Sequence, residues 1–175
     1  GTWQHYSNLG SALAAYVLEE ATKTPFSDYT RKHIFMPLHL ASTGWFFKDI
    51  NQRQHATLYN ATQQAIPLYS LITYPDGGLK STLQDLSLYL QEIMKGAAGN
   101  GNLLSSSLYP QLLDPQFNPA TTPQNLNPKE PNLGLFWVHR LNGEVGHTGS
   151  DPGITTFLFF HPGTKTGRIF LTNTS

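Results

Sequence analysis

The sequence predicts an α+β fold in which helical segments come first and an antiparallel β-meander follows. Apolar residues recur at helical spacing in the first part of the chain, and strand-like alternation fills 133–175. Between these parts, residues 114–132 contain five prolines, a density that excludes a regular helix or strand. We therefore expect a helical part over 1–132, ending in this proline-rich loop, and antiparallel strands over 133–175.

The composition limits the kinds of function to consider. The 175 residues are 39% hydrophobic and 12% aromatic, as in a folded globular protein. Lysine plus arginine number 11, as do aspartate plus glutamate, so nucleic acid is not an expected partner. No apolar run reaches the roughly 18 residues of a membrane helix. The absence of cysteine excludes disulfides and thiolate catalysis, and the histidines lack metal-binding spacing, so no metal site is expected.

The first helix is expected to begin at Asn8, whose side chain can cap the first turn. Its apolar face follows i, i+3, i+4 spacing at Leu9, Ala12, Leu13, Tyr16 and Val17. Pro25 ends this helix, and a second short helix is predicted over 26–35. The pattern weakens over 43–74, where we expect a loop with short irregular pieces.

A third helix follows the turn signal Asp76-Gly77-Gly78. Ser81 and Gln84 have the spacing of a capping box, and the glycines from Gly96 onward end the helix. Its apolar face comprises Leu83, Leu86, Tyr89, Leu90, Ile93 and Met94. A shorter helix is predicted to start near the serines at 105–107.

Beyond the proline-rich loop, four segments have strand character. They span 133–141, 144–148, 155–161 and 168–173. Asn142-Gly143 and Pro162-Gly163 are hairpin-type turn signals between them. No internal repeat is present, so these segments are expected to form a single antiparallel sheet.

Two short motifs could carry chemistry. Tyr6-Ser7-Asn8 precedes the first helix, and His147-Thr148-Gly149 ends a predicted strand, where the glycine allows a ligand or another backbone to approach closely. Taken singly, both have structural readings: Tyr6 as a half-buried aromatic residue, Asn8 as a helix cap and His147 as a polar strand residue. The combination and order of the two motifs make them informative.

In these motifs the chain resembles the penicillin-recognising serine hydrolases, which include class C β-lactamases, serine DD-peptidases and related esterases. Tyr6-Ser7-Asn8 is similar to their Tyr-x-Asn motif, and His147-Thr148-Gly149 to their Lys-Thr-Gly or His-Thr-Gly motif. Four further stretches resemble the family's "IFxPLGM", "GGLxST", "YGLGW" and "LANTS" segments, at 34–38, 77–82, 133–137 and 171–175. The resemblance covers nearly the whole chain, in the family's order, and implies a β-lactamase/transpeptidase-like fold.

The resemblance also implies roles for seven residues. Tyr6 would act as general base and acid, and Asn8 would bind the acyl amide of the substrate. The backbone N–H of Ser150 would form half of the oxyanion hole. The substrate would lie along His147, Thr148 and Gly149, with Thr148 and the charge of His147 near its carboxylate. Asn173 would border the same carboxylate site.

The family's nucleophile motif, Ser-x-x-Lys, does not occur in this sequence. In the family it lies upstream of Tyr-x-Asn, where this chain has five residues. Either the chain is the C-terminal part of one incomplete catalytic domain, or it is a catalytically dead relative. We favour the first interpretation, in which the N-terminal portion of the same protein is a necessary partner and the chain alone is inactive.

The complete protein is then expected to form an acyl-enzyme on peptide, β-lactam or ester substrates, without a cofactor. Histidine in place of the commoner lysine favours the DD-peptidase and D-aminopeptidase type, and makes substrate binding depend on pH, because imidazole ordinarily titrates near pH 6.5. The alternative is a non-catalytic binding protein on the same scaffold. The resemblance also implies an extracytoplasmic bacterial location.

Overall fold

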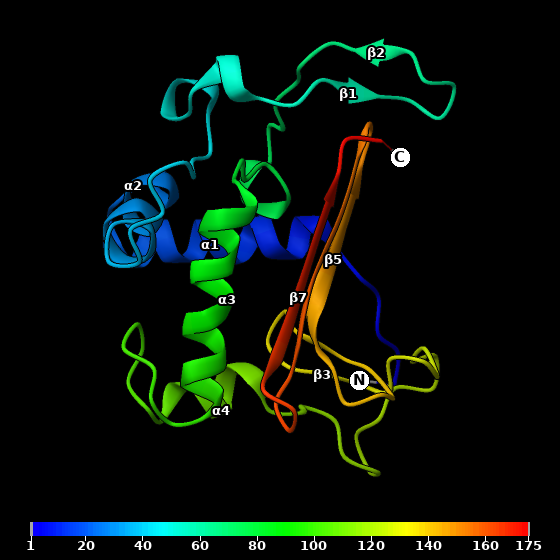
Figure 1. Cartoon of the computed structure of the whole chain (residues 1–175). Helices are drawn as coiled ribbons and strands as arrows, with labels where there is room; N and C mark the ends of the chain where they lie inside the picture. Colours follow the sequence, from blue (N-terminus) through cyan, green and yellow to red (C-terminus); the bar gives the residue numbers. More distant parts are fainter. Residues whose placement is uncertain (1, 175) are drawn as a thin grey trace. The chain divides into compact units, whose positions relative to one another are not determined.

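The computed structural model of the chain describes residues 2–174. Gly1, the first residue of the expected helical part, and Ser175, the last residue of the expected strand part, lie outside the described residues. Helices come first and a five-stranded antiparallel sheet follows, in the order β3-β4-β5-β6-β7 (Figure 1). The α+β fold class and the order of elements predicted from the sequence are therefore confirmed.

Helix α1 spans Asn8–Thr22, in agreement with the predicted spacing. Its cap, however, is Ser7 and not Asn8: the Ser7 side chain accepts a hydrogen bond from the Gly10 N–H at 3.1 Å. Ser7 has an extended backbone, as a capping residue requires, whereas Asn8 is already the first helical residue. The prediction of Asn8 as the cap was wrong by one position.

The predicted second helix is formed by α2, Phe26–Thr30, followed directly by the π-helical turn η1, Arg31–Phe35. This segment supplies Phe35 to a hydrophobic cluster with Leu40 and Trp45. The Trp45 indole N–H donates to the Thr30 hydroxyl at 2.8 Å, so its polar atom is satisfied inside the cluster. After it come only short elements: η2 Phe47–Asp49, η3 Gln52–Gln54, β1 Leu58–Tyr59, β2 Ala65–Ile66 and η4 Tyr74–Asp76.

Helix α3 spans Leu83–Ala97, and α4 spans Leu108–Leu113. The expected capping box between Ser81 and Gln84 does not form. The hydroxyl that accepts from the first turn of α3 is that of Thr82, which accepts a hydrogen bond from the Asp85 N–H at 3.2 Å. The hydroxyl of Ser81 lies instead 2.7 Å from that of Thr43, which itself donates to the buried Asp85 carboxylate. Ser81 thus belongs to a buried polar network and not to the helix cap.

The strand predicted over 133–141 is split into β3, Asn132–Leu133, and β4, Val138–His139. Phe136 has a φ of 64°, which no strand can accommodate, and the Gly134 N–H turns back to the Trp137 carbonyl at 2.6 Å. A Cβ at Gly134 would lie 2.7 Å from the Leu112 carbonyl oxygen. The close approach of α4 therefore fixes a tight turn where the sequence suggested continuous strand.

Three long strands complete the sheet: β5 Val145–Asp151, β6 Ile154–His161 and β7 Thr166–Thr172. The chain forms two compact units that share these strands. The first unit comprises Gly1–His5, Leu90–Thr148 and Phe157–Phe170, and the second comprises Tyr6–Tyr89, Gly149–Thr156 and Leu171–Ser175. Each unit contains both helix and strand, and a subdomain boundary at residue 132 stays a prediction.

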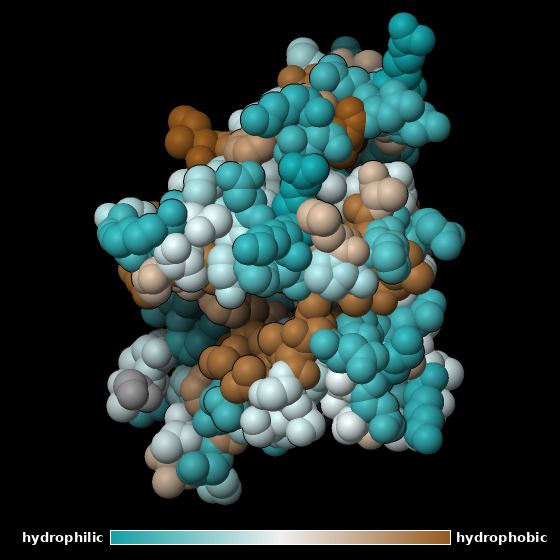
Figure 2. Space-filling model, turned by 90° about the vertical axis from the view of Figure 1, so that its left-hand side faces the viewer, coloured by the Kyte–Doolittle hydropathy of each residue, from teal (hydrophilic) through white to brown (hydrophobic). Residues whose placement is uncertain are grey.

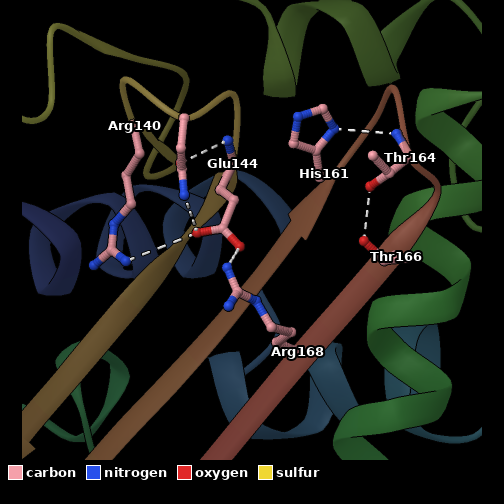
Figure 3. A network of polar contacts seen from close by, with 7 residues as sticks. Arg140, Glu144, His161, Thr164, Thr166 and Arg168 are labelled. Carbon is pink, nitrogen blue, oxygen red and sulfur yellow. Dashed lines mark hydrogen bonds and ion pairs between the residues drawn. The ribbon is translucent and has the colours of Figure 1, made fainter.

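In the first unit, a buried carboxylate ties the turn before β5 to β7. Glu144 is only 5% exposed, and it pairs with Arg168 and lies 4.0 Å from Arg140 (Figure 3). The hydrogen bond from Arg168 is the largest cause that lowers the pKa of Glu144, followed by that from Asn142. Glu144 is therefore ionised at neutral pH and acts as an electrostatic link across the sheet.

Candidate active site

The predicted site residues are shared between the two units. The second unit holds Tyr6, Asn8 and Asn173, together with Gly149 and Ser150 of β5. The first unit holds His147 and Thr148, the two residues of β5 that precede Gly149. Strand β5 therefore carries the third motif across the boundary between the units, and each part of the site is built from its own unit.

The Tyr6-Ser7-Asn8 motif marks the start of α1. Tyr6 immediately precedes the capping residue and is 68% exposed, and Asn8 is an exposed residue of the first turn. Since Ser7 caps the helix, the side chain of Asn8 is not required for that task. The structural readings of Tyr6 as half-buried and of Asn8 as a helix cap are both wrong, and both side chains reach the surface.

His147 and Thr148 lie in the middle of β5 and alternate between its faces. The Nδ1 atom of His147 is hydrogen-bonded to the carbonyl oxygen of Thr148. A carbonyl oxygen only accepts, so Nδ1 is the donor in this hydrogen bond. Thr148 is exposed and His147 is half-buried.

Only the first part of β5 is paired with β4. The Arg140 N–H donates to the Glu144 carbonyl at 2.9 Å, and Val138 is paired with Gly146. In an antiparallel pair, every second residue directs its N–H and C=O groups toward the same neighbouring strand. The even-numbered residues of β5 therefore direct these groups toward the β4 side. The register of β4 covers Val145 and Gly146. No strand of the described sheet therefore pairs with Thr148 and Ser150 on this side, and their N–H groups face an open edge.

Gly149 packs closely against strand β6. A Cβ at this position would lie 2.4 Å from the Thr156 hydroxyl oxygen of β6. A side chain at this position would require the Thr156 hydroxyl to move, so the glycine allows close packing against β6. The space that Gly149 provides is thus used by a neighbouring strand.

Asn173 follows β7 and is used by the fold. Its side-chain amide donates to the Thr57 carbonyl at 2.8 Å, and its own carbonyl accepts from the Tyr59 N–H at 2.9 Å. These bonds attach β1 to the end of β7. A role of Asn173 at a substrate carboxylate stays a prediction.

Tyr69 is a residue near the site that the sequence did not indicate. It follows β2 in an irregular loop, and its hydroxyl donates to the carbonyl oxygen of Pro152 at 2.9 Å. Pro152 is the first residue of the turn between β5 and β6, two positions after Ser150. A contact over 83 positions in the sequence leaves no local pattern by which it could be found.

Within residues 2–174, no cluster of three or more histidine, aspartate or glutamate side chains could hold a metal ion. None of the helices in this part of the chain has the length and apolar character needed to cross a membrane.

The chain matches a known family over its full length. The family model described as Beta-lactamase matches residues 1–175. A beta-lactamase of Yersinia enterocolitica is 23% identical over 206 residues, an alignment that covers 99% of this chain and 51% of that protein. The chain therefore spans about half the length of the curated relatives it matches.

Solved structures share the fold. A class C beta-lactamase aligns with a TM-score of 0.79 at 19% identity, over 100% of this chain and 54% of the other. The D-amino acid amidase of Ochrobactrum anthropi aligns with a TM-score of 0.74 at 21% identity, over 98% and 50%. These similarities extend over both compact units.

Proposed function

Because this chain belongs to the beta-lactamase family, we propose that it is the C-terminal part of a serine hydrolase that acts through an acyl-enzyme. The observation that carries the proposal is the open edge of β5, where the Ser150 N–H points outward directly after the His147-Thr148-Gly149 motif. A backbone donor at an uncovered edge is what an oxyanion hole requires. The substrates are peptides, β-lactams or esters, and no cofactor takes part.

The roles follow the two motifs. Tyr6 acts as general base and acid, and Asn8 binds the acyl amide, for which their exposed positions at the start of α1 leave them available. Thr148 and the Nε2 side of His147 bind the substrate carboxylate. Histidine at this position, which resembles the His-Thr-Gly motif of DD-peptidases and D-aminopeptidases, supports a peptidase in preference to a β-lactamase.

The nucleophile must come from outside this chain, since the sequence contains no Ser-x-x-Lys. The exposed apolar face of α1, formed by Leu9, Leu13, Tyr16 and Val17, each more than half exposed, supports a further segment that covers it. We infer that an N-terminal portion of the same protein supplies both the nucleophile and this cover. The extracytoplasmic location expected for the family is part of the same proposal.

Acylation by a fluorescent penicillin or fluorophosphonate tests the proposal. The 175-residue chain alone should remain unlabelled, and a protein that joins it to a Ser-x-x-Lys segment should be labelled stoichiometrically. In the joined protein, Tyr6→Phe should slow acylation by about 10²–10⁴-fold. Tyr16→Phe, which removes the hydroxyl of another exposed tyrosine, on the helix that follows Tyr6, is the matched control and should have no effect.

A non-catalytic binding protein on the same scaffold is the second candidate. The absence of Ser-x-x-Lys from the chain favours it. It would bind a cell-wall peptide through the same β5 edge without forming a covalent bond. Saturable binding of such a peptide with no labelling of the joined protein would support this candidate, and labelling of the chain by itself would contradict both.

A further inference from the structure

The end of strand β5 is held by a residue far away in the sequence. The Tyr69 hydroxyl donates to the Pro152 carbonyl at 2.9 Å, so the loop after β2 is joined to the turn between β5 and β6. All the residues concerned belong to the second unit. Only Asp151 separates Ser150 from the residue that Tyr69 holds.

The same turn rests directly on the β1–β2 hairpin. Gly153 has a φ of 74°, and a Cβ there would lie 2.8 Å from both the Leu58 Cβ and the Ile66 Cδ1 atoms. Only glycine fits this left-handed, tightly packed position. The hairpin is itself anchored, since the Tyr59 N–H donates to the Asn173 carbonyl at 2.9 Å. The turn is therefore seated on a support that does not depend on the pairing of β5 with β4.

The hydroxyl of Tyr69 is suited to a permanent contact. Burial raises the pKa of the Tyr69 phenol, and the negative charge of Asp151 and a hydrogen bond to its carboxylate raise it further, so the hydroxyl has two acceptors at this turn, Asp151 and the Pro152 carbonyl. The group therefore keeps its proton throughout the neutral range and remains a donor to Pro152. Its ring is half-buried, which limits the rotamers that it can adopt.

We propose that Tyr69 is a positioning residue for the backbone N–H of Ser150, which it orients through the Pro152 carbonyl. Ser150 has a neighbouring strand, β6, on one side only, so the anchored turn supplies a second restraint on the direction of this donor. An oxyanion donor must be held within about 0.5 Å of its productive place to be effective. The catalytic meaning of this orientation rests on the function proposed above, whereas the orientation itself does not.

The first experiment measures the orientation in the 175-residue chain. Tyr69→Phe removes only the hydroxyl, and Tyr59→Phe is the matched control in the same region, because Tyr59 uses its backbone N–H for its hydrogen bond. The ¹⁵N order parameter of the Ser150 N–H should be about 0.85 in the parent chain and in Tyr59→Phe, and should be clearly lower in Tyr69→Phe, although pairing with β6 keeps it above the value of a flexible loop. An unchanged value overturns the proposal. A fall spread evenly over the whole second unit overturns it too, since Tyr69 would then be a general structural residue.

The second experiment measures catalysis in the joined protein. Tyr69→Phe should lower kcat about tenfold and leave KM unchanged, because a misdirected oxyanion donor affects the transition state more than the bound substrate. A change in KM alone, or an unchanged kcat despite a disordered Ser150, overturns the catalytic part. If the unsubstituted joined protein is not acylated at all, the proposed function fails, and the order parameter still decides the role of Tyr69.

Discussion

At the residue scale, His147 gives a prediction that depends on pH. The Nδ1 atom donates to the Thr148 carbonyl. If the charge of His147 holds a substrate carboxylate, KM of the joined protein should rise as the pH increases from 5.5 to 8, because imidazole is ordinarily neutral above about 6.5. His147→Lys should remove the dependence, since lysine stays charged over this range. Equal and flat KM profiles for the two proteins would exclude this role.

Glu144 gives a prediction for stability at low pH. Its pKa lies below the usual 4.5, mainly because of the hydrogen bond from Arg168. A lowered pKa in the folded state stabilises the fold at every pH above 4.5, and this stabilisation is lost as the pH falls through the folded value. Arg168→Met should therefore reduce the free energy of unfolding by about 1 kcal/mol at pH 7, a modest value because Arg168 is largely exposed, and by less at pH 3.

Urea unfolding at the two pH values measures this difference. Lys23→Met is the control, since Lys23 and Glu20 form an ion pair in which both side chains are exposed. It should change the free energy of unfolding by less than about 0.5 kcal/mol at either pH. An equal loss at pH 7 and pH 3 for Arg168→Met would show that Arg168 contributes packing and not charge.

The sequence located the two motifs because their residues are close together in the chain. It misassigned the capping residue, since Ser7 and Asn8 are both good caps and the choice depends on the backbone angle of a single residue. It did not find Tyr69, because a hydrogen bond between residues 83 positions apart is decided by the tertiary fold. The two motifs were therefore visible in the sequence, and the long-range contact of Tyr69 with Pro152 was not.

At the element scale, Gly96 does not end α3, as the sequence suggested, but is part of the helix. Gly96 lies within the helix, and a Cβ there would come 1.9 Å from the Cε1 atom of Tyr109, which is 1% exposed. The Tyr109 hydroxyl donates to the buried Glu92 carboxylate at 2.7 Å, which fixes the ring in place. The glycine therefore allows a large aromatic side chain to pack against the helix.

Two matched substitutions test this interpretation. Gly96→Ala should lower the free energy of unfolding by about 1–3 kcal/mol, because the ring cannot move away from the added methyl group. Gly10→Ala, in the first turn of α1, should raise it by about 0.5 kcal/mol, because its Cβ meets nothing closer than 3.5 Å. Thermal or urea unfolding measures both, and a stabilising Gly96→Ala would show that Tyr109 is not fixed.

Element types were predictable where the hydrophobic period is long, as in α1, α3 and the strands β6 and β7. The break between β3 and β4 was not, because it depends on the α4 carbonyl groups that approach Gly134. Alternating residues over 133–141 suggest a strand whether or not another element interrupts it. A tertiary contact here overrides the local pattern.

At the scale of the whole molecule, the distribution of apolar surface is unusual for a chain with a well-packed interior. Hydrophobic side chains reach the surface in several places on the face shown in Figure 2. On α1 in particular, Leu13 is 58% and Val17 59% exposed, one turn apart on one face of the helix. A complete globular protein rarely leaves such a helical face uncovered.

The last prediction tests whether the apolar face of α1 is buried in the joined protein. Replacing Leu13 and Val17 together by Gln should change the free energy of unfolding of the 175-residue chain by less than about 0.5 kcal/mol, since neither side chain is buried in it. The same double substitution in the joined protein should cost about 3 kcal/mol or more, because the two side chains would then be buried against the added segment. Leu141→Gln, at a residue 71% exposed on the first unit, is the control and should be neutral in both proteins. A large loss in the 175-residue chain would mean that the face of α1 is already covered, and neutrality in both would mean that the N-terminal portion packs elsewhere.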